Sequence, residues 1–199
     1  MRTIYQIDHG FLGETAEIEP GQPAPASWTF TAPPKIPRDK AAKWDGEWVL
    51  VDESVYKDAM AVIQAKALQS RAELLNQAID TERTARIAAG MPYAFPDGTG
   101  GTVQLRHERD ILNVNAVGTA AMMITSAGDT ATKMEFRDQE DVTHQMSAPE
   151  MLAMAQDVMG WISAHYAAAW THKDAIKELV EAADGEGVAS YDITQGWPS

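Results

Sequence analysis

The sequence predicts an α+β protein, in which an extended, β-rich N-terminal arm with a tryptophan hairpin precedes a helical domain. Two long helices and one shorter helix are expected to pack with a small antiparallel sheet of hairpins. Three observations predict this class: helical apolar periodicity over residues 147–184, a stretch without Gly or Pro over residues 53–89, and short alternating segments bounded by Gly and Asp. We divide the chain into an arm (1–52), a long helix (53–89) and an α+β domain (90–199).

Composition excludes several classes of function. With 199 residues, 45% of them hydrophobic, the chain can bury a core. A formal net charge of -13 argues against a surface for nucleic acid or anionic lipid. The absence of cysteine excludes disulfides and thiol chemistry. No stretch approaches the roughly 20 apolar residues of a membrane helix, so we expect synthesis in the cytoplasm without membrane insertion.

The first 37 residues predict extended structure. Residues 3–8 and 14–19 have the pattern of short strands. Six prolines lie within residues 20–37, around the segment Trp28-Thr29-Phe30, and proline at this density cannot join a central strand. Two interpretations remain open, a linker or an arm that lies on its own domain or on a partner chain. In the second, Trp28 and Phe30 are candidate partner contacts.

Residues 42–52 predict a β-hairpin with its turn at Asp45-Gly46. Trp44 and Trp48 then meet near the turn and cover one face. The pair is expected to staple a small module, while sugar binding by stacking is the alternative. We include both side chains among the candidate partner contacts.

Residues 53–89 predict the first long helix, since they are rich in good helix formers. Tyr56, Met60, Ile63 and Ala67 follow at steps of four, three and four, the spacing of a coiled-coil seam. Leu74, Leu75, Ala78 and Ile79 are expected to extend it. Such a helix is a hairpin arm or part of an oligomeric bundle, and a homo-oligomer, with a trimer favoured, would bury Tyr56, Met60 and Ile63.

The next segment predicts two hairpins around a helix. Residues 91–95 and 102–106 are expected strands, and the glycines between them lack the Lys-Ser/Thr ending of a phosphate-binding loop. Residues 108–126 predict the shorter helix, in which Gly118 indicates a close helix contact. Residues 132–137 and 141–146 alternate as the second hairpin.

Residues 147–184 predict the second long helix. Ser147, Pro149 and Glu150 have the spacing of a capping box with proline in the first turn. Gly185 is the expected left-handed end of the helix. Beyond it we expect an edge strand over residues 188–194, and an isolated Trp197 that docks on a neighbour.

Patterns of catalytic chemistry are weak throughout the chain. His165 and His172 share a helix face but stand about 10 Å apart along the axis, too far for one metal ion. The aromatic residues around His165 predict a packing cluster instead. The charged run at residues 106–110 is expected to be a helix-start ion network. We therefore expect no enzyme activity, no catalytic residues, no cofactor and no metal.

Four blocks in residues 83–173 resemble a domain of unknown function found in tail proteins of tailed phages. They are Ala-Arg-Ile-Ala-Ala-Gly-Met-Pro-Tyr-Ala-Phe-Pro-Asp-Gly (85–98), Ile-Leu-Asn-Val-Asn (111–115), Phe-Arg-Asp (136–138) and Ser-Ala-His-Tyr-Ala-Ala-Ala-Trp-Thr-His-Lys (163–173). The arm, with Pro33-Pro34, Trp44, Gly46 and Trp48, is similar to the proline and tryptophan module of phage tail-fibre and tail-fibre-assembly proteins. The resemblance implies a phage setting, a tail location and protein partners, and it transfers no catalytic residue.

The expected function is therefore that of a virion protein at the phage tail tip, associated with a fibre or the baseplate and acting by protein assembly. A host receptor is a further possible partner. The alternative is a tail-fibre assembly chaperone that leaves before maturation, and the ten methionines suit adaptable binding surfaces. A third hypothesis is a glycan-binding module that uses Trp44, Trp48 or Trp170.

Overall fold

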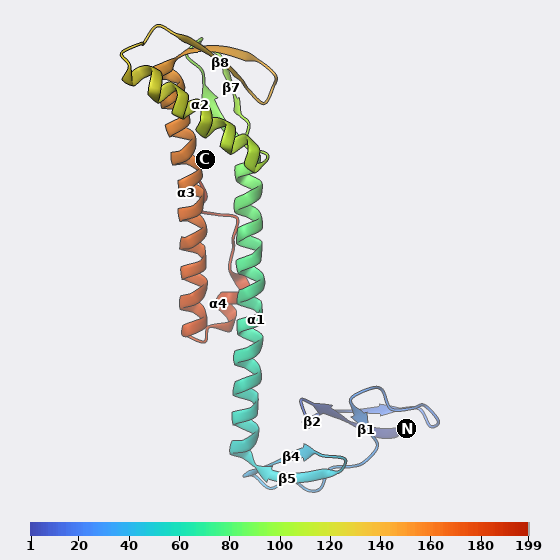
Figure 1. Ribbon diagram of the computed structural model, residues 1–199. Coiled ribbons are helices and arrows are strands. Elements are labelled where there is room, and N and C mark those ends of the chain that lie inside the picture. The colour runs from blue at the N-terminus through green and yellow to red at the C-terminus, as the bar shows by residue number, and fades with distance from the viewer. Residues whose placement is uncertain (199) are drawn as a thin grey trace. The chain divides into compact units, whose positions relative to one another are not determined.

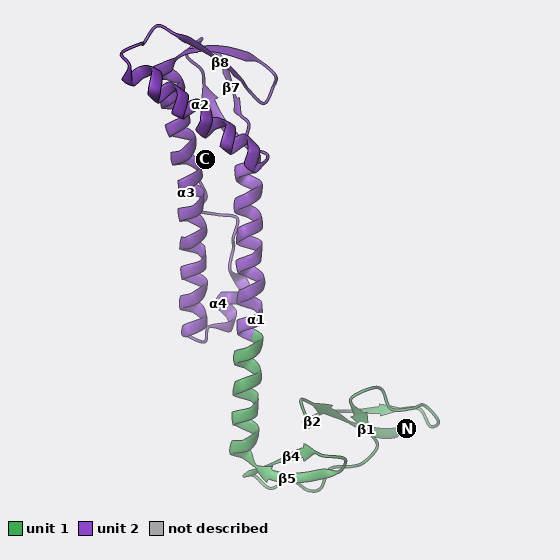
Figure 2. Cartoon of the chain, in the orientation of Figure 1, with its two compact units in different colours: residues 1–67 green, residues 68–199 purple. Residues whose placement is uncertain are grey.

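The computed structural model describes residues 1–198 and confirms the α+β class. The chain forms two compact units, Met1–Ala67 and Leu68–Ser199 (Figure 2). The boundary between them falls inside the long helix α1, Glu53–Ala88, and not at either of its ends. Among the described residues, no helix combines the length and apolar character required to cross a membrane.

Unit 1 contains a five-stranded antiparallel sheet in the order β3-β1-β2-β4-β5 (Figure 1). The strands are β1 (Arg2–Asp8), β2 (Phe11–Ile18), β3 (Trp28–Thr29), β4 (Lys40–Trp44) and β5 (Trp48–Asp52). The second strand starts earlier than predicted and includes Gly13, against which the Gln6 side chain lies so closely that a Cβ would be 2.7 Å from its Oε1. The proline-flanked β3 pairs with β1 at the edge of the sheet, as proline-rich sequence requires. Part of the arm thus lies on its own domain.

Unit 1 has a very small core. Its fully buried apolar side chains are Ile4, Phe11 and Ala42. The Tyr56 ring meets Phe11 edge-on, with ring centroids 5.1 Å apart. Most other apolar side chains of unit 1, such as Trp28, Trp44 and Trp48, are only half-buried.

The core of unit 2 lies where α2 (Glu108–Ser126) and the first half of α3 (Ala148–Glu181) cross beneath two hairpins. The hairpins are β6 (Met91–Ala94) with β7 (Gly100–Val103), and β8 (Lys133–Arg137) with β9 (Thr143–Ser147). They form two separate two-stranded sheets. The fully buried side chains on α3 include Met151, Met154 and Val158, so the predicted apolar stripe of this helix forms the centre of the core.

Two local predictions about these helices are confirmed. The Glu150 carboxylate accepts hydrogen bonds from the backbone N–H and the hydroxyl of Ser147, at 2.6 and 2.7 Å, which closes the start of α3. Gly118 faces Ala155 across the helix crossing, where a Cβ on Gly118 would lie 2.6 Å from the Ala155 Cβ. The absence of a side chain at residue 118 sets how closely α2 and α3 approach.

The end of the chain differs from its prediction. Ala183, with φ of 54°, is the left-handed residue after α3, while Gly185 begins a further helix, α4 (Gly185–Ser190). The expected edge strand over 188–194 is wrong, because α4 and the following segment run back between α1 and α3 (Figure 1). This arrangement makes a second apolar cluster from Ala72, Ile79, Ala169 and Ile176, flanked by Leu75, Val180, Tyr191, Ile193 and Trp197.

Candidate functional site

The side chains expected to contact partners lie at several places in the fold. Trp44 and Trp48 meet edge-to-face with ring centroids 5.0 Å apart, as predicted for the hairpin. The Trp48 indole N–H donates to the carbonyl of Thr31 at 2.7 Å, and so ties the proline segment to β5. Phe30 is covered by the Arg2 guanidinium at 4.1 Å, and Trp28 is half-buried in β3. These aromatic side chains therefore hold unit 1 together while remaining partly exposed.

The predicted seam is the set Tyr56, Met60, Ile63 and Ala67 on α1. None of the seam residues belongs to either apolar core cluster of unit 2. Tyr56 contacts Phe11 within unit 1. One heptad beyond Ala67, Leu74 is 66% exposed. The predicted extension through Leu75 and Ile79 is wrong, because both pack in the second apolar cluster. Those two residues pack against α3. Of the remaining seam positions, Met60 and Ile63 are half-buried, whereas Ala67 and Leu74 are exposed.

Trp197 is not the isolated aromatic that the sequence indicated. Its indole N–H donates to the carbonyl of Ile193 at 2.7 Å, and its ring lies 5.2 Å from the His172 ring and beneath the Arg86 guanidinium. His165 is buried beside Trp161, with its Nδ1–H donating to the Trp161 carbonyl at 2.9 Å, which confirms part of the predicted packing cluster. Tyr166 and Trp170, expected in the same cluster, are 40% and 61% exposed and lie against each other instead. Trp197 thus belongs to the internal packing of unit 2.

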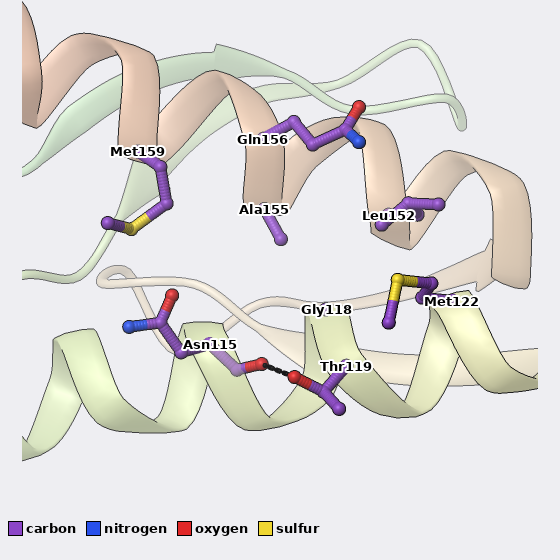
Figure 3. Close-up of a pocket in the computed structure, with 8 residues that line it drawn as sticks. All are labelled: Asn115, Gly118, Thr119, Met122, Leu152, Ala155, Gln156 and Met159. Atoms are coloured by element: carbon purple, nitrogen blue, oxygen red, sulfur yellow. Dashed lines mark hydrogen bonds between the residues drawn. The ribbon is translucent and has the colours of Figure 1, made fainter.

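A largely apolar groove lies between α2 and α3 (Figure 3). We call it the methionine groove, and it encloses about 310 Å³. Its lining residues are Asn115, Gly118, Thr119, Met122, Leu152, Ala155, Gln156 and Met159. Thr119 donates its hydroxyl to the Asn115 carbonyl at 2.8 Å, so this polar group is turned onto its own helix. Met122 is 50% exposed, and beside the groove Met123 is 67% exposed.

A buried ionic network joins the two hairpins of unit 2. His144 on β9 is 1% exposed and lies between two carboxylates, with Nδ1 2.7 Å from Asp97 and Nε2 3.2 Å from Asp138. Its ring stacks on Phe95 at a centroid distance of 3.6 Å. Asp138 also accepts from the backbone N–H of Val142 at 2.7 Å.

The charges of this network stabilise one another. Burial disfavours the His144 cation, but the hydrogen bonds that its ring donates to Asp97 and Asp138 outweigh burial and raise the pKa of His144 above 6.5. Hydrogen bonds from Thr99 and then His144 lower the pKa of Asp97 to about 2. Burial opposes ionisation of Asp138 as well, yet the bonds from Val142 and His144 bring its pKa below 3.8. Each ring nitrogen of His144 thus faces a carboxylate, which favours the protonated ring, and the Asp97 side chain of this network is 37% exposed.

Sequence reasoning did not single out this network, although the signal existed. His144 and Met146 stand two residues apart in an alternating strand, which places both on the inner face. Only the fold brings Asp97, 47 residues away, onto the same imidazole. Among the described residues, no group of three or more His, Asp or Glu side chains is arranged to hold a metal ion.

The geometry therefore favours surfaces for assembly, the seam and the methionine groove. A family model described as "Domain of unknown function (DUF4376)" matches residues 69–194. No curated protein and no solved structure matches the chain. The match covers more than half of the chain and nearly all of unit 2, so the protein belongs to the DUF4376 family.

Proposed function

We propose that this protein is a virion component at the tail tip of a bacteriophage, associated with a tail fibre or the baseplate, and that it acts by protein assembly. The phage setting is supported by the resemblance of residues 83–173 and of the proline and tryptophan arm to tail proteins. The observation that carries the assembly role is the core of unit 1, where three apolar side chains are fully buried in 67 residues.

A unit of this size gains little stability from such a core. Domains below about 70 residues rarely obtain more than 3–5 kcal/mol from their own hydrophobic burial, and small natural domains add disulfides, metals or partners. This chain has no cysteine. In unit 1 no group of His, Asp and Glu is arranged for a metal. We infer that a partner surface adds stability, since Val49 and Leu50 on the edge strand β5 are 43% and 37% exposed.

The seam supports self-association as part of this role. An isolated helix is marginal in water, and most helical stability in proteins comes from packing of an apolar face. The seam repeats at coiled-coil steps, and outside the helix only Tyr56 packs against another ring. We propose a homo-oligomer through the seam, with a trimer as the favoured number, in which Met60 and Ile63 form the central layers.

Replacing Ile63 by aspartate is expected to convert this oligomer into a monomer, because three charges would meet in one buried layer. The matched control is Ala65→Asp, which adds the same charge on the opposite face of the helix. Light scattering coupled to size exclusion gives the masses. A monomeric native chain, or equal dissociation by both variants, would contradict the seam as the contact.

A tail-fibre assembly chaperone that leaves before maturation is the second candidate function. The methionine groove and the adjoining Met123 favour it, since flexible thioether side chains adapt to apolar segments of several shapes. A chaperone would bind unassembled fibre through this surface and would be absent from mature particles.

Quantitative mass spectrometry of purified particles separates the two functions. Peptides from residues 53–66 and 141–173 are expected in mature particles, at a few copies each and in constant ratio to fibre or baseplate proteins. Peptides found only in the unassembled fraction of the lysate would reject the virion role and favour the chaperone. If the chain is expressed but its peptides are found neither in mature particles nor in the unassembled fraction, both candidate functions are rejected.

A further inference from the structure

The sheet of unit 1 has two edges, and only one of them is protected against a further strand. At the first edge, β3 is two residues long and lies between Pro25 and the pair Pro33-Pro34. Short edge strands and neighbouring prolines, which lack a backbone donor, prevent a sheet from growing. At the second edge, β5 is five residues long and contains neither proline nor lysine. The sheet is therefore open to a further strand at β5 and closed to one at β3.

The outer edge of β5 has backbone groups without partners in the chain. The inner edge pairs with β4 over the whole strand, from Trp48 to Asp52. Alternate residues of an antiparallel strand direct their N–H and C=O groups to opposite sides, so the residues that do not bond β4 face outward. Within residues 1–198, no backbone group outside β4 bonds to the backbone of β5. The outward groups are thus available to another chain.

Side chains on both faces of β5 are exposed beside this edge. Val49 is 43% exposed and Leu50 is 37% exposed. Successive residues of a strand point to opposite faces, so the exposure belongs to the edge itself and not to one face of the sheet. Both residues lie in the apolar run Trp48–Val51. An apolar edge strand with unpaired backbone groups is a site of association between chains.

The charges around β5 select between two kinds of partner. Asp52 and Glu53 follow the strand, and each has a lysine partner within unit 1. Asp45 and Glu47 precede it at the turn and are exposed. A second copy of the chain fits poorly, because symmetric pairing centred on Leu50 places Glu47 of one copy opposite Glu53 of the other, and like charges in opposite positions destabilise a sheet. A segment with Lys or Arg at the end that meets the turn complements these carboxylates.

We propose that the outer edge of β5 binds an extended segment of a different tail protein, which joins the sheet as a further strand. Bonds between the two backbones supply affinity in this mode of recognition, and side-chain contacts supply specificity. β-Branched or aromatic side chains of the segment pair across the strands with Val49 and Leu50. This inference rests on the assembly role proposed above and names how one partner is held.

Selection of peptides on the full purified chain tests the proposal. The probe is a displayed library of random peptides of about ten residues, long enough for one strand. The selected sequences are expected to be rich in Val, Ile, Thr and Tyr, with Lys or Arg at one end. In isothermal titration, Val49→Lys is expected to weaken their binding by about tenfold or more, because it places a charge at the edge. The matched control is Val55→Lys on α1, where valine is 45% exposed, and it should leave the affinity unchanged.

Methylation of alternate backbone nitrogens in a selected peptide tests strand addition itself. The peptide keeps its side chains and loses the backbone donors on one edge. The methylation pattern on the edge that faces β5 should abolish binding, while the pattern on the other edge should preserve it. This comparison uses the native chain, so it does not depend on the folding of a variant.

Four results would overturn strand addition at β5. They are the absence of strand-forming sequences among the selected peptides, equal binding by native chain and Val49→Lys, the same effect of both methylation patterns, and dissociation of a native oligomer by Val49→Lys. The last result would assign the edge to a second copy of the chain. Mass spectrometry of particles tests the virion role separately, so a chain found in particles whose β5 edge binds no peptide would reject only the strand addition.

Discussion

Replacing His144 by phenylalanine is expected to destabilise unit 2 by about 3 kcal/mol, within the range for removing one partner of a buried ion pair. The new ring keeps the stacking on Phe95 but donates no hydrogen bond. The Asp138 carboxylate, which is 3% exposed, would then be buried without its cationic partner. Urea unfolding followed by circular dichroism measures the change in the free energy of unfolding.

The double variant His144→Phe with Asp138→Asn is the control for this interpretation. Asparagine removes the buried charge, so the pair of changes should cost less than the sum of the single changes. Additive losses would show that His144 and Asp138 do not interact. If His144→Phe alone were as stable as the native chain, the network would not contribute to stability.

The same network predicts how stability varies with pH. The pKa of His144 is raised in the folded state, so its contribution is complete below 6.5 and is lost as pH rises through the higher folded value. The pKa values of Asp97 and Asp138 are lowered, so their contributions are complete above 3.8 and are lost as pH falls through the folded values. The network therefore contributes most to the free energy of unfolding between pH 3.8 and pH 6.5. The contribution of His144 to the free energy of unfolding should therefore fall as the pH rises above 6.5 and through its folded pKa, and this fall should be absent in His144→Phe.

Replacing Gly118 by valine is expected to destabilise unit 2 by about 2 kcal/mol, as overpacking of a close helix contact does. The new Cβ would lie 2.6 Å from the Ala155 Cβ, and neither atom belongs to a flexible side chain that can turn aside. The helices α2 and α3 must therefore move apart, which loosens the core around Val158 and Met151. Thermal and urea unfolding measure the loss.

The matched control is Gly160→Val on α3. A Cβ at residue 160 meets no atom within 4 Å, so valine there adds only its small helix-propensity difference. The stability should change by less than about 0.5 kcal/mol. Equal effects at the two positions would mean that the close approach at Gly118 does not govern the packing of α2 against α3.

Local signals allowed much of the fold to be predicted. The capping box at Ser147, the Asp45-Gly46 turn and the bounds of α2 follow from hydrogen bonding and backbone preferences within a few residues. The spacing of Tyr56, Met60 and Ile63 likewise predicted a seam on α1, because side-chain positions on a helix are periodic, and self-association through it stays a prediction. The boundary between the two compact units falls inside α1, where no Gly, Pro or turn sequence marks it.

The candidate sites were predicted less completely, since they join distant residues. Trp170 was expected in the aromatic cluster around His165, but its side chain is 61% exposed, and the rings that lie against His165 are those of Trp161 and Trp197. The seam was assigned to Leu75 and Ile79 as well, and only packing against α3 showed that these residues face inward.

By itself the sequence determined the α+β class, the helices and their caps, the tryptophan hairpin and the absence of thiol chemistry, because each follows from local spacing or from composition. Tertiary structure alone decided that α4 and the last segment return between α1 and α3, that Trp197 packs against His172, and that Asp97 and Asp138 both bond His144. The physical reason is that burial and ion pairing depend on which surfaces meet. Those encounters are set by the balance of all contacts in the folded chain, and no short stretch of sequence encodes them.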